Sequence, residues 1–235
     1  AIADAVDAYE GGDESEAKVI AENARGYVEL LRGHIWKEEE VLFPMADDVL
    51  SPADQEDLYV YETNPKDPDL YRCGFLFASD VGTMGLNESD SARLRDWLLK
   101  GGFLWADDFW GTEAWDQWEQ EIAKVLPPEA YPIEDVSAAD PVMRVLFDLE
   151  RVPQITNVTF WQKNNGKTSE RGEDSAQVHV RAIRDAHRRI MVLMTHNTDV
   201  GDSFEREKED SAYARLFSPP GYALGIDVLL YSLTE

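Results

Sequence analysis

The sequence predicts an α/β protein: a largely parallel sheet with helices on both faces over residues 60–235, preceded by a helical segment over residues 1–59. Two observations support this fold class. Beyond residue 60, short strands that are apolar on both faces alternate with helical patterns, which is typical of a buried parallel sheet. Before residue 60, apolar residues recur at helical spacing and no strand pattern occurs. The two patterns meet at Glu62–Asp69, which is typical of a turn-rich linker.

The N-terminal segment is predicted to contain two helices. Residues 14–43 contain no proline and carry an apolar stripe, so they form a long amphipathic helix that ends at Pro44. Ser51 and Pro52 are typical of the N-cap and first position of a helix, which predicts a second, short helix through Leu58.

The α/β part begins with a strand over Cys73–Ala78, an apolar run of strand length. Asn87 predicts the N-cap of the next helix, with Asp90 facing back toward it, and Gly101 ends that helix. The remaining elements follow from the same patterns: a strand over Phe103–Ala106, a helix over Trp115–Val125, strands over Val178–Ile183 and Ile190–Thr195 with a tight polar connection, and an apolar closing helix over Tyr222–Leu233.

The charge balance excludes several classes of partner. The 235 residues include 47 Asp and Glu against 22 Lys and Arg, a net charge of −25. Such a surface does not bind nucleic acid or anionic membranes, because no basic stripe displaces counterions from phosphates. No apolar run is long enough for membrane insertion. The single cysteine excludes a disulfide framework, and since no basic-then-apolar leader precedes the first helix, we expect a soluble, cytoplasmic protein.

His34 and Glu38 lie four residues apart, on one face of the predicted long helix and on its apolar stripe. The string H-I-W-K-E-E-E-V-L-F-P-M, preceded by Y-V-E-L-L-R, closely resembles the hemerythrin-like (HHE cation-binding) family. The resemblance covers residues 1–58. It implies that His34 and Glu38 occupy the ligand positions of one helix in a four-helix bundle with a two-iron site.

The segment departs from that family because it contains no second histidine, whereas the family draws ligands from all four helices. We therefore expect a metal-free or weakly metal-binding helical remnant in the isolated chain. Iron would bind only where other chains complete the site. The N-terminal helices are accordingly the expected surface for self-association or for a partner protein.

Three predicted strands are followed directly by polar residues. In an open parallel sheet, ligands bind at the edge where the carboxyl ends of the strands meet, so these residues are the candidate ligand or metal site. They are Asp80, Asp107, Asp108, His196, Asn197, Asp199 and Asp202. Oxygen-rich groups with one imidazole suit a divalent cation such as Mg, Ca or Mn. The alternative is that these aspartates cap helices and turns. No catalytic residue is assigned.

Three strings in the α/β part carry a second resemblance: Y-R-C-G-F-L-F-A-S-D-V-G-T-M-G, L-L-K-G-G-F-L-W-A-D-D-F-W-G and H-N-T-D-V-G-D-S-F-E. They resemble a bacterial family that is known only as a domain of unknown function. The resemblance implies a flavodoxin-like sheet of the class I glutamine amidotransferase-like type, and no established activity. Amidotransferase chemistry needs a cysteine on a strand-to-helix elbow, and Cys73 lies at the start of a strand, so we do not expect that reaction.

These patterns favour a non-catalytic binding or scaffold domain that carries an incomplete hemerythrin-like segment. One alternative is a metal-dependent hydrolase that uses the strand-end carboxylates. Another is an iron- or oxygen-binding hemerythrin-like protein that self-association completes. Because two truncated resemblances meet near residue 60, a chimera of two pieces is a further hypothesis. The sequence specifies no ligand and no cofactor.

Overall fold

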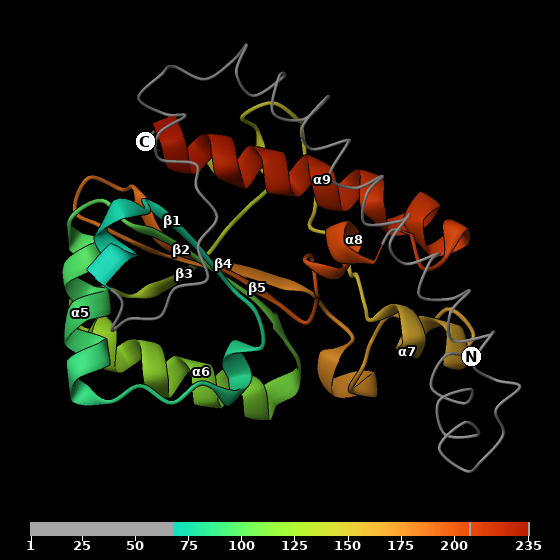
Figure 1. The fold of residues 1–235 in the computed structure, drawn as a ribbon, viewed down its shortest axis with the longest axis horizontal. Coiled ribbons are helices and arrows are strands. Elements are labelled where there is room, and N and C mark those ends of the chain that lie inside the picture. Colours follow the sequence, from blue (N-terminus) through green and yellow to red (C-terminus); the bar gives the residue numbers. More distant parts are fainter. Residues whose placement is uncertain (1–67, 207, 235) are drawn as a thin grey trace, which may run out of the picture. The chain divides into compact units, whose positions relative to one another are not determined.

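The computed structural model describes residues 68–206 and 208–234, whose arrangement is drawn in Figure 1. The helices predicted within residues 1–59, the domain boundary near residue 60 and most of the linker lie outside the described residues. So do His34 and Glu38, the two residues of the predicted hemerythrin-like site. These expectations therefore stay predictions.

Five strands form one sheet in the order β1–β2–β5–β4–β3. Their bounds are β1 Phe75–Ala78, β2 Phe103–Phe109, β3 Ile133–Asp135, β4 His179–Arg184 and β5 Ile190–His196. The β1–β2 and β2–β5 pairs are parallel, whereas the β5–β4 and β4–β3 pairs are antiparallel. The predicted α/β class is confirmed, but the prediction of a largely parallel sheet is wrong for half of the pairings.

The short connection between β4 and β5 explains this difference. Only Asp185–Arg189 join the two strands, and a parallel crossover needs a dozen or more residues. The connection closes on itself, because Asp185 and Arg189 pair through their backbones and the Asp185 carboxylate accepts from His187 N. A hairpin is therefore the only pairing available to these two strands.

Two cores lie on the two faces of the sheet, because successive strand residues point to opposite sides. Leu104 and Ala106 of β2 pack into one core with α5 and α6, whereas Phe103 and Trp105 pack into the other with α9. Figure 1 shows α5 and α6 on one face and α9 on the other. Both faces are thus covered by helices, as the sequence predicts.

The helices are α5 Glu88–Leu99, α6 Gly111–Val125, α7 Val158–Lys163, α8 Asp202–Glu205 and α9 Ser211–Thr234. Four short 3-10 turns accompany them: η3 Pro68–Arg72, η4 Val81–Thr83, η5 Pro141–Met143 and η6 Gly172–Ser175. None of the helices in the described residues has the length and apolar character of a membrane span.

The start of α5 agrees with the sequence in detail. Asn87 Oδ1 accepts from Asp90 N at 2.9 Å, and its Nδ2 donates to the Asp90 carboxylate at 2.7 Å. The end of the chain differs, because the predicted closing helix is only the second half of α9. That helix continues through Pro219 and Pro220, since Tyr213 on the N-terminal side is fully buried in the core.

Candidate functional site

The polar residues at the carboxyl ends of β1, β2 and β5 lie at one edge of the sheet, with Asp107 and Asp108 inside β2 and His196 as the last residue of β5. Because these three strands are parallel neighbours, Ala78 of β1 pairs with Ala106 of β2, and Phe109 of β2 pairs with His196 of β5. The register of β2 against β5 shifts between Ala106 and Phe109. The residues within this shift, Asp107 and Asp108, point into different surroundings.

Asp107 is fully buried and closes the loop after β5. Its Oδ2 accepts from Val200 N at 2.7 Å and from Gly201 N at 3.1 Å, and its Oδ1 accepts from the Thr195 hydroxyl. Burial raises the pKa of Asp107 to about 7, although these three donors oppose the rise. The side chain has no path to a ligand, so its contacts are structural.

Asp199 and Asp202 lie at the start of α8 and are also buried. Asp199 Oδ1 accepts from Asp202 N at 2.9 Å, while Asp202 accepts from Asn157 Nδ2 at 3.2 Å and pairs with Arg206 at 3.4 Å. Burial and the carboxylates of Asp108, Asp202 and Asp107 raise the pKa of Asp199 to about 9. These contacts match the alternative expectation that such aspartates cap helices and turns.

Asp108 has a positive φ of 55°, which a non-glycine residue adopts only at a cost, and its carboxylate is half-buried. Its Oδ1 accepts from Trp110 Nε1 at 3.0 Å and its Oδ2 accepts from Ser79 Oγ at 3.2 Å. Burial raises the pKa of Asp108, and the nearby carboxylates of Glu170 and Asp80 raise it further. Asp108 is thus a fixed acceptor at the end of β2.

His196 and Asn197 contact the start of α6 and hold it against the end of β5. The His196 ring stacks on Phe109 with centroids 4.9 Å apart, and its Nε2 lies 3.0 Å from Gly111 O. Burial lowers the pKa of His196 to about 4, so the ring is neutral at physiological pH and Nε2 donates to that carbonyl. Asn197 Oδ1 accepts from Gly111 N at 2.8 Å, and its Nδ2 donates to Gln177 O at 2.7 Å.

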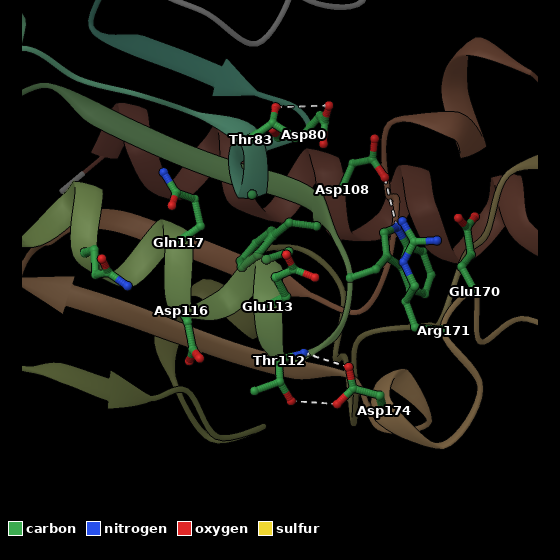
Figure 2. Close-up of a pocket in the computed structure, with 15 residues that line it drawn as sticks. Asp80, Thr83, Asp108, Thr112, Glu113, Asp116, Gln117, Glu170, Arg171 and Asp174 are labelled. Carbon is green, nitrogen blue, oxygen red and sulfur yellow. Dashed lines mark hydrogen bonds between the residues drawn. The ribbon is translucent and has the colours of Figure 1, made fainter.

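A groove of about 960 Å³ opens beside Asp108, between the strand ends, α6 and the loop before β4. Its lining is strongly acidic. The carboxylates are Asp80, Asp108, Glu113, Asp116, Glu170 and Asp174, and the only cation among the lining residues is Arg171. Figure 2 shows Asp80, Asp108 and Glu170 toward one end of the groove, with Asp174 and Thr112 toward the other. We call this cavity the acidic groove.

Hydrogen bonds orient two further carboxylates of the acidic groove. Glu170 Oε1 accepts from Thr156 Oγ1 at 2.7 Å and from Asn157 N at 2.9 Å. Asp174 accepts from Thr112 Oγ1 at 2.6 Å and from Thr112 N at 2.9 Å, and these bonds hold its pKa below the usual value. The acceptors are therefore in place before any ligand arrives.

The predicted site residues do not form one site. Two of them, Asp80 and Asp108, line the acidic groove. Three are buried and do not line it: Asp107, Asp199 and Asp202. The last two, His196 and Asn197, form hydrogen bonds with the start of α6. Within the described residues, no group of three or more His, Cys, Asp or Glu side chains is arranged to hold a metal ion. The structure gives the expected divalent-cation site no support.

Sequence reasoning missed most of the acidic groove. No motif in the sequence singles out Glu170, Arg171 and Asp174, which lie in the loop between α7 and β4, and Glu113 and Asp116 project from the first turns of α6. A usable signal was present, because a polar loop rich in acidic residues is the kind of segment that borders ligand sites at strand ends. The signal did not say which helix the loop would face.

Comparison with known proteins identifies a family and no activity. Residues 57–233 match the family described as "Domain of unknown function (DUF4159)". No curated protein matches the chain.

Proposed function

The chain belongs to the DUF4159 family of unknown function, and from that premise we propose that its α/β domain is a non-catalytic binding domain for a positively charged organic ligand. The acidic groove is the observation that carries the proposal. Its volume of about 960 Å³ is that of a small-molecule site, and its lining holds six carboxylates against one guanidinium.

Electrostatics support a cation as the ligand. Asp80 and Glu170 both lie close enough to Asp108 to raise its pKa, so each of them repels the Asp108 carboxylate in the free protein. An ammonium or guanidinium group placed among them relieves that repulsion and donates hydrogen bonds to their free lone pairs. A neutral ligand gains only the hydrogen bonds.

An organic cation suits the groove better than a metal ion. A divalent metal needs several ligands at about 2.0–2.6 Å from one point, and the described residues contain no such group of three. An amine or guanidinium tolerates acceptors spread along a groove, because its N–H groups point in several directions. The carboxylates here are spread from Asp80 to Asp174.

Titration of the full chain with spermidine and with arginine amide, followed by calorimetry, tests the proposal. A matched pair of double variants makes the test specific. Asp108→Asn with Glu170→Gln should weaken binding at least tenfold. Asp148→Asn with Glu129→Gln removes the same charge from exposed positions outside the acidic groove and should change the Kd less than twofold. Equal effects from both double variants, or no binding by the wild type, would overturn the proposal.

A metal-dependent hydrolase is the second candidate, favoured by one observation. Asp108 lies in the acidic groove with a raised pKa, and such carboxylates serve as acids or bases in hydrolases. The candidate is weaker because Asp107, Asp199 and Asp202 do not line the cavity. Thermal unfolding with Mg, Mn and Ca separates the two candidates, because a specific metal site raises the unfolding temperature most with its own metal, whereas screening of the acidic groove raises it similarly with all three.

We extend the proposal to the family resemblances. The parallel β1–β2–β5 part of the sheet, with helices on both faces, supports a relation to the class I glutamine amidotransferase-like, flavodoxin-like fold without its catalytic cysteine, whereas the antiparallel pairs of β4 depart from that fold. For residues 1–59 the proposal is a hemerythrin-like segment whose iron site other chains complete. Iron analysis of the purified chain, with His34→Ala as the comparison, tests that part: stoichiometric iron lost in the variant supports it, and iron-free wild-type protein at every oligomeric state contradicts it.

A further inference from the structure

Three residues of the acidic groove, Glu170, Arg171 and Asp174, come from one loop segment, Thr168–Ser175, which we call the groove wall. The wall contains no strand and only the short η6 turn, so regular backbone pairing does not fix its shape. Something else must hold it. Because the wall contributes three of the seven charged lining residues, whatever holds the wall also controls the geometry of the site.

Gln154 contacts both ends of the wall. Its Oε1 accepts from Thr168 Oγ1 at 2.8 Å, and its Nε2 donates to Ser175 O at 2.8 Å. The same Nε2 donates to Asn197 O at 3.1 Å, directly after β5. One side chain therefore ties the beginning and the end of the wall to the edge of the sheet.

The hydrogen-bond pattern fixes the orientation of the Gln154 amide. Both partners of Nε2 are backbone carbonyls, which only accept, and the partner of Oε1 is a hydroxyl, which can donate. A flipped amide would set its oxygen against two carbonyl oxygens. Only a side chain with one acceptor and two donors at this length satisfies all three bonds, so neither Glu nor Met can replace Gln154.

Buried hydroxyls complete the wall. Ser175 is fully buried, and its Oγ accepts from Arg171 N at 2.8 Å and lies 2.8 Å from Ser169 Oγ. Thr156, two residues after Gln154, is also fully buried and donates to Glu170. The segment that begins at Gln154 thus fixes both the path of the wall and the carboxylate that it presents.

We infer that Gln154, which does not line the acidic groove, is its positioning residue: it pre-forms the Thr168–Ser175 wall so that Glu170 and Asp174 face the ligand before binding. This inference rests on the proposed function of the groove. A pre-formed wall should raise the affinity for the ligand, because ordering a loop residue costs roughly 1 kcal/mol of free energy and that cost is then avoided during binding.

Hydrogen exchange and calorimetry on the full chain test the inference with two matched variants. Gln154→Met keeps the length of the side chain and removes its three hydrogen bonds. Thr168→Val removes one bond at nearly constant volume, and Thr168→Ser restores the hydroxyl. We expect Gln154→Met to raise amide exchange in residues 168–176 while β2 and β5 stay protected, and to weaken spermidine binding about tenfold. Thr168→Val should show a smaller loss of the same kind, which Thr168→Ser reverses.

The two readouts separate failure of the inference from failure of the proposed function. If the wild type binds no cationic probe, the proposed function fails, and exchange in the wall still decides whether Gln154 holds it. If the wild type binds and Gln154→Met binds equally well, the inference is wrong. It is also wrong if exchange rises equally in the wall, β2 and β5, because that result describes global destabilisation instead of a local loss of order.

Discussion

The carboxylate of Asp174 occupies the space in which a side chain of residue 111 would lie. Gly111 opens α6 with a φ of +79°, and a Cβ added to it would overlap Asp174 Oδ2. Asp174 can therefore approach the first turn of the helix and accept from Thr112 N at 2.9 Å, which caps that end of α6. The glycine and the aspartate are far apart in the chain and form one structural unit.

Gly111→Ala should accordingly destabilise the domain. The substitution places a Cβ at positive φ and displaces the capping carboxylate, which together cost about 2–4 kcal/mol. Urea unfolding followed by tryptophan fluorescence measures the loss. Gly74→Ala is the matched control, because an added Cβ there meets no atom within 4 Å, and it should change stability by less than about 1 kcal/mol. Equal stability of the two variants would contradict this account of Gly111.

The stability of the domain should fall as the pH rises from about 4 to about 9. The folded state raises the pKa of Asp199 from 3.8 to about 9 and that of Asp107 to about 7, so it holds protons that the unfolded chain releases. The stabilisation is complete below pH 4 and is lost as the pH passes through the folded-state pKa values. Since one pKa unit corresponds to about 1.4 kcal/mol, a shift of about two units at either aspartate already changes the free energy of unfolding by roughly 3 kcal/mol.

Asp199→Asn isolates this effect from the general repulsion of a chain with a net charge of −25. The amide oxygen still accepts from Asp202 N but does not titrate, so the variant should be more stable than the wild type at pH 8 and nearly equal to it at pH 4. Unfolding in urea at both pH values measures the difference. Asp148→Asn, at a carboxylate with 80 % of its side chain exposed, should leave the pH dependence of the wild type unchanged.

Binding of a cationic probe to the acidic groove should weaken with salt. Most of the lining carboxylates are solvent-exposed, and interactions between exposed charges are screened over about 8 Å at physiological ionic strength. We expect the Kd for spermidine to rise several-fold between 50 and 300 mM NaCl, measured by calorimetry. A Kd independent of salt would mean that apolar contacts, and not the carboxylates, bind the probe.

The sequence predicted the local features that short-range chemistry decides. The Asn87 cap and the stop at Gly101 both follow from side-chain and backbone preferences within one turn, and both predictions are confirmed. The strand-end location of Asp108 likewise follows from the apolar runs before it. The sequence does not predict which of the neighbouring aspartates, Asp107 or Asp108, faces the groove. The register shift between β2 and β5 decides this, and these two strands pair residues about 90 positions apart in the chain.

The path of the groove wall could not be predicted from the sequence for the same reason. Hydrogen bonds within Thr168–Ser175 shape the segment, but the bonds that place it against the sheet come from Gln154, Thr156 and Asn157. The passage of α9 through Pro219 is a further example. Local preference ends a helix before a proline, but burial of Tyr213 and Phe217 on the far side outweighs the missing backbone bonds.

Asp227 of α9 should tolerate substitution by asparagine and not by leucine. Its carboxylate is fully buried, and Oδ1 accepts from Leu146 N at 2.8 Å and from Phe147 N at 3.0 Å. Asparagine keeps that acceptor at nearly the same size, so the variant should stay within about 1 kcal/mol of the wild type. Leucine has a similar shape but leaves two amide groups without an acceptor, which costs about 2–4 kcal/mol. Urea unfolding of the two variants side by side measures the difference. If the leucine variant proved as stable as the asparagine variant, Asp227 would not anchor the loop before residue 148.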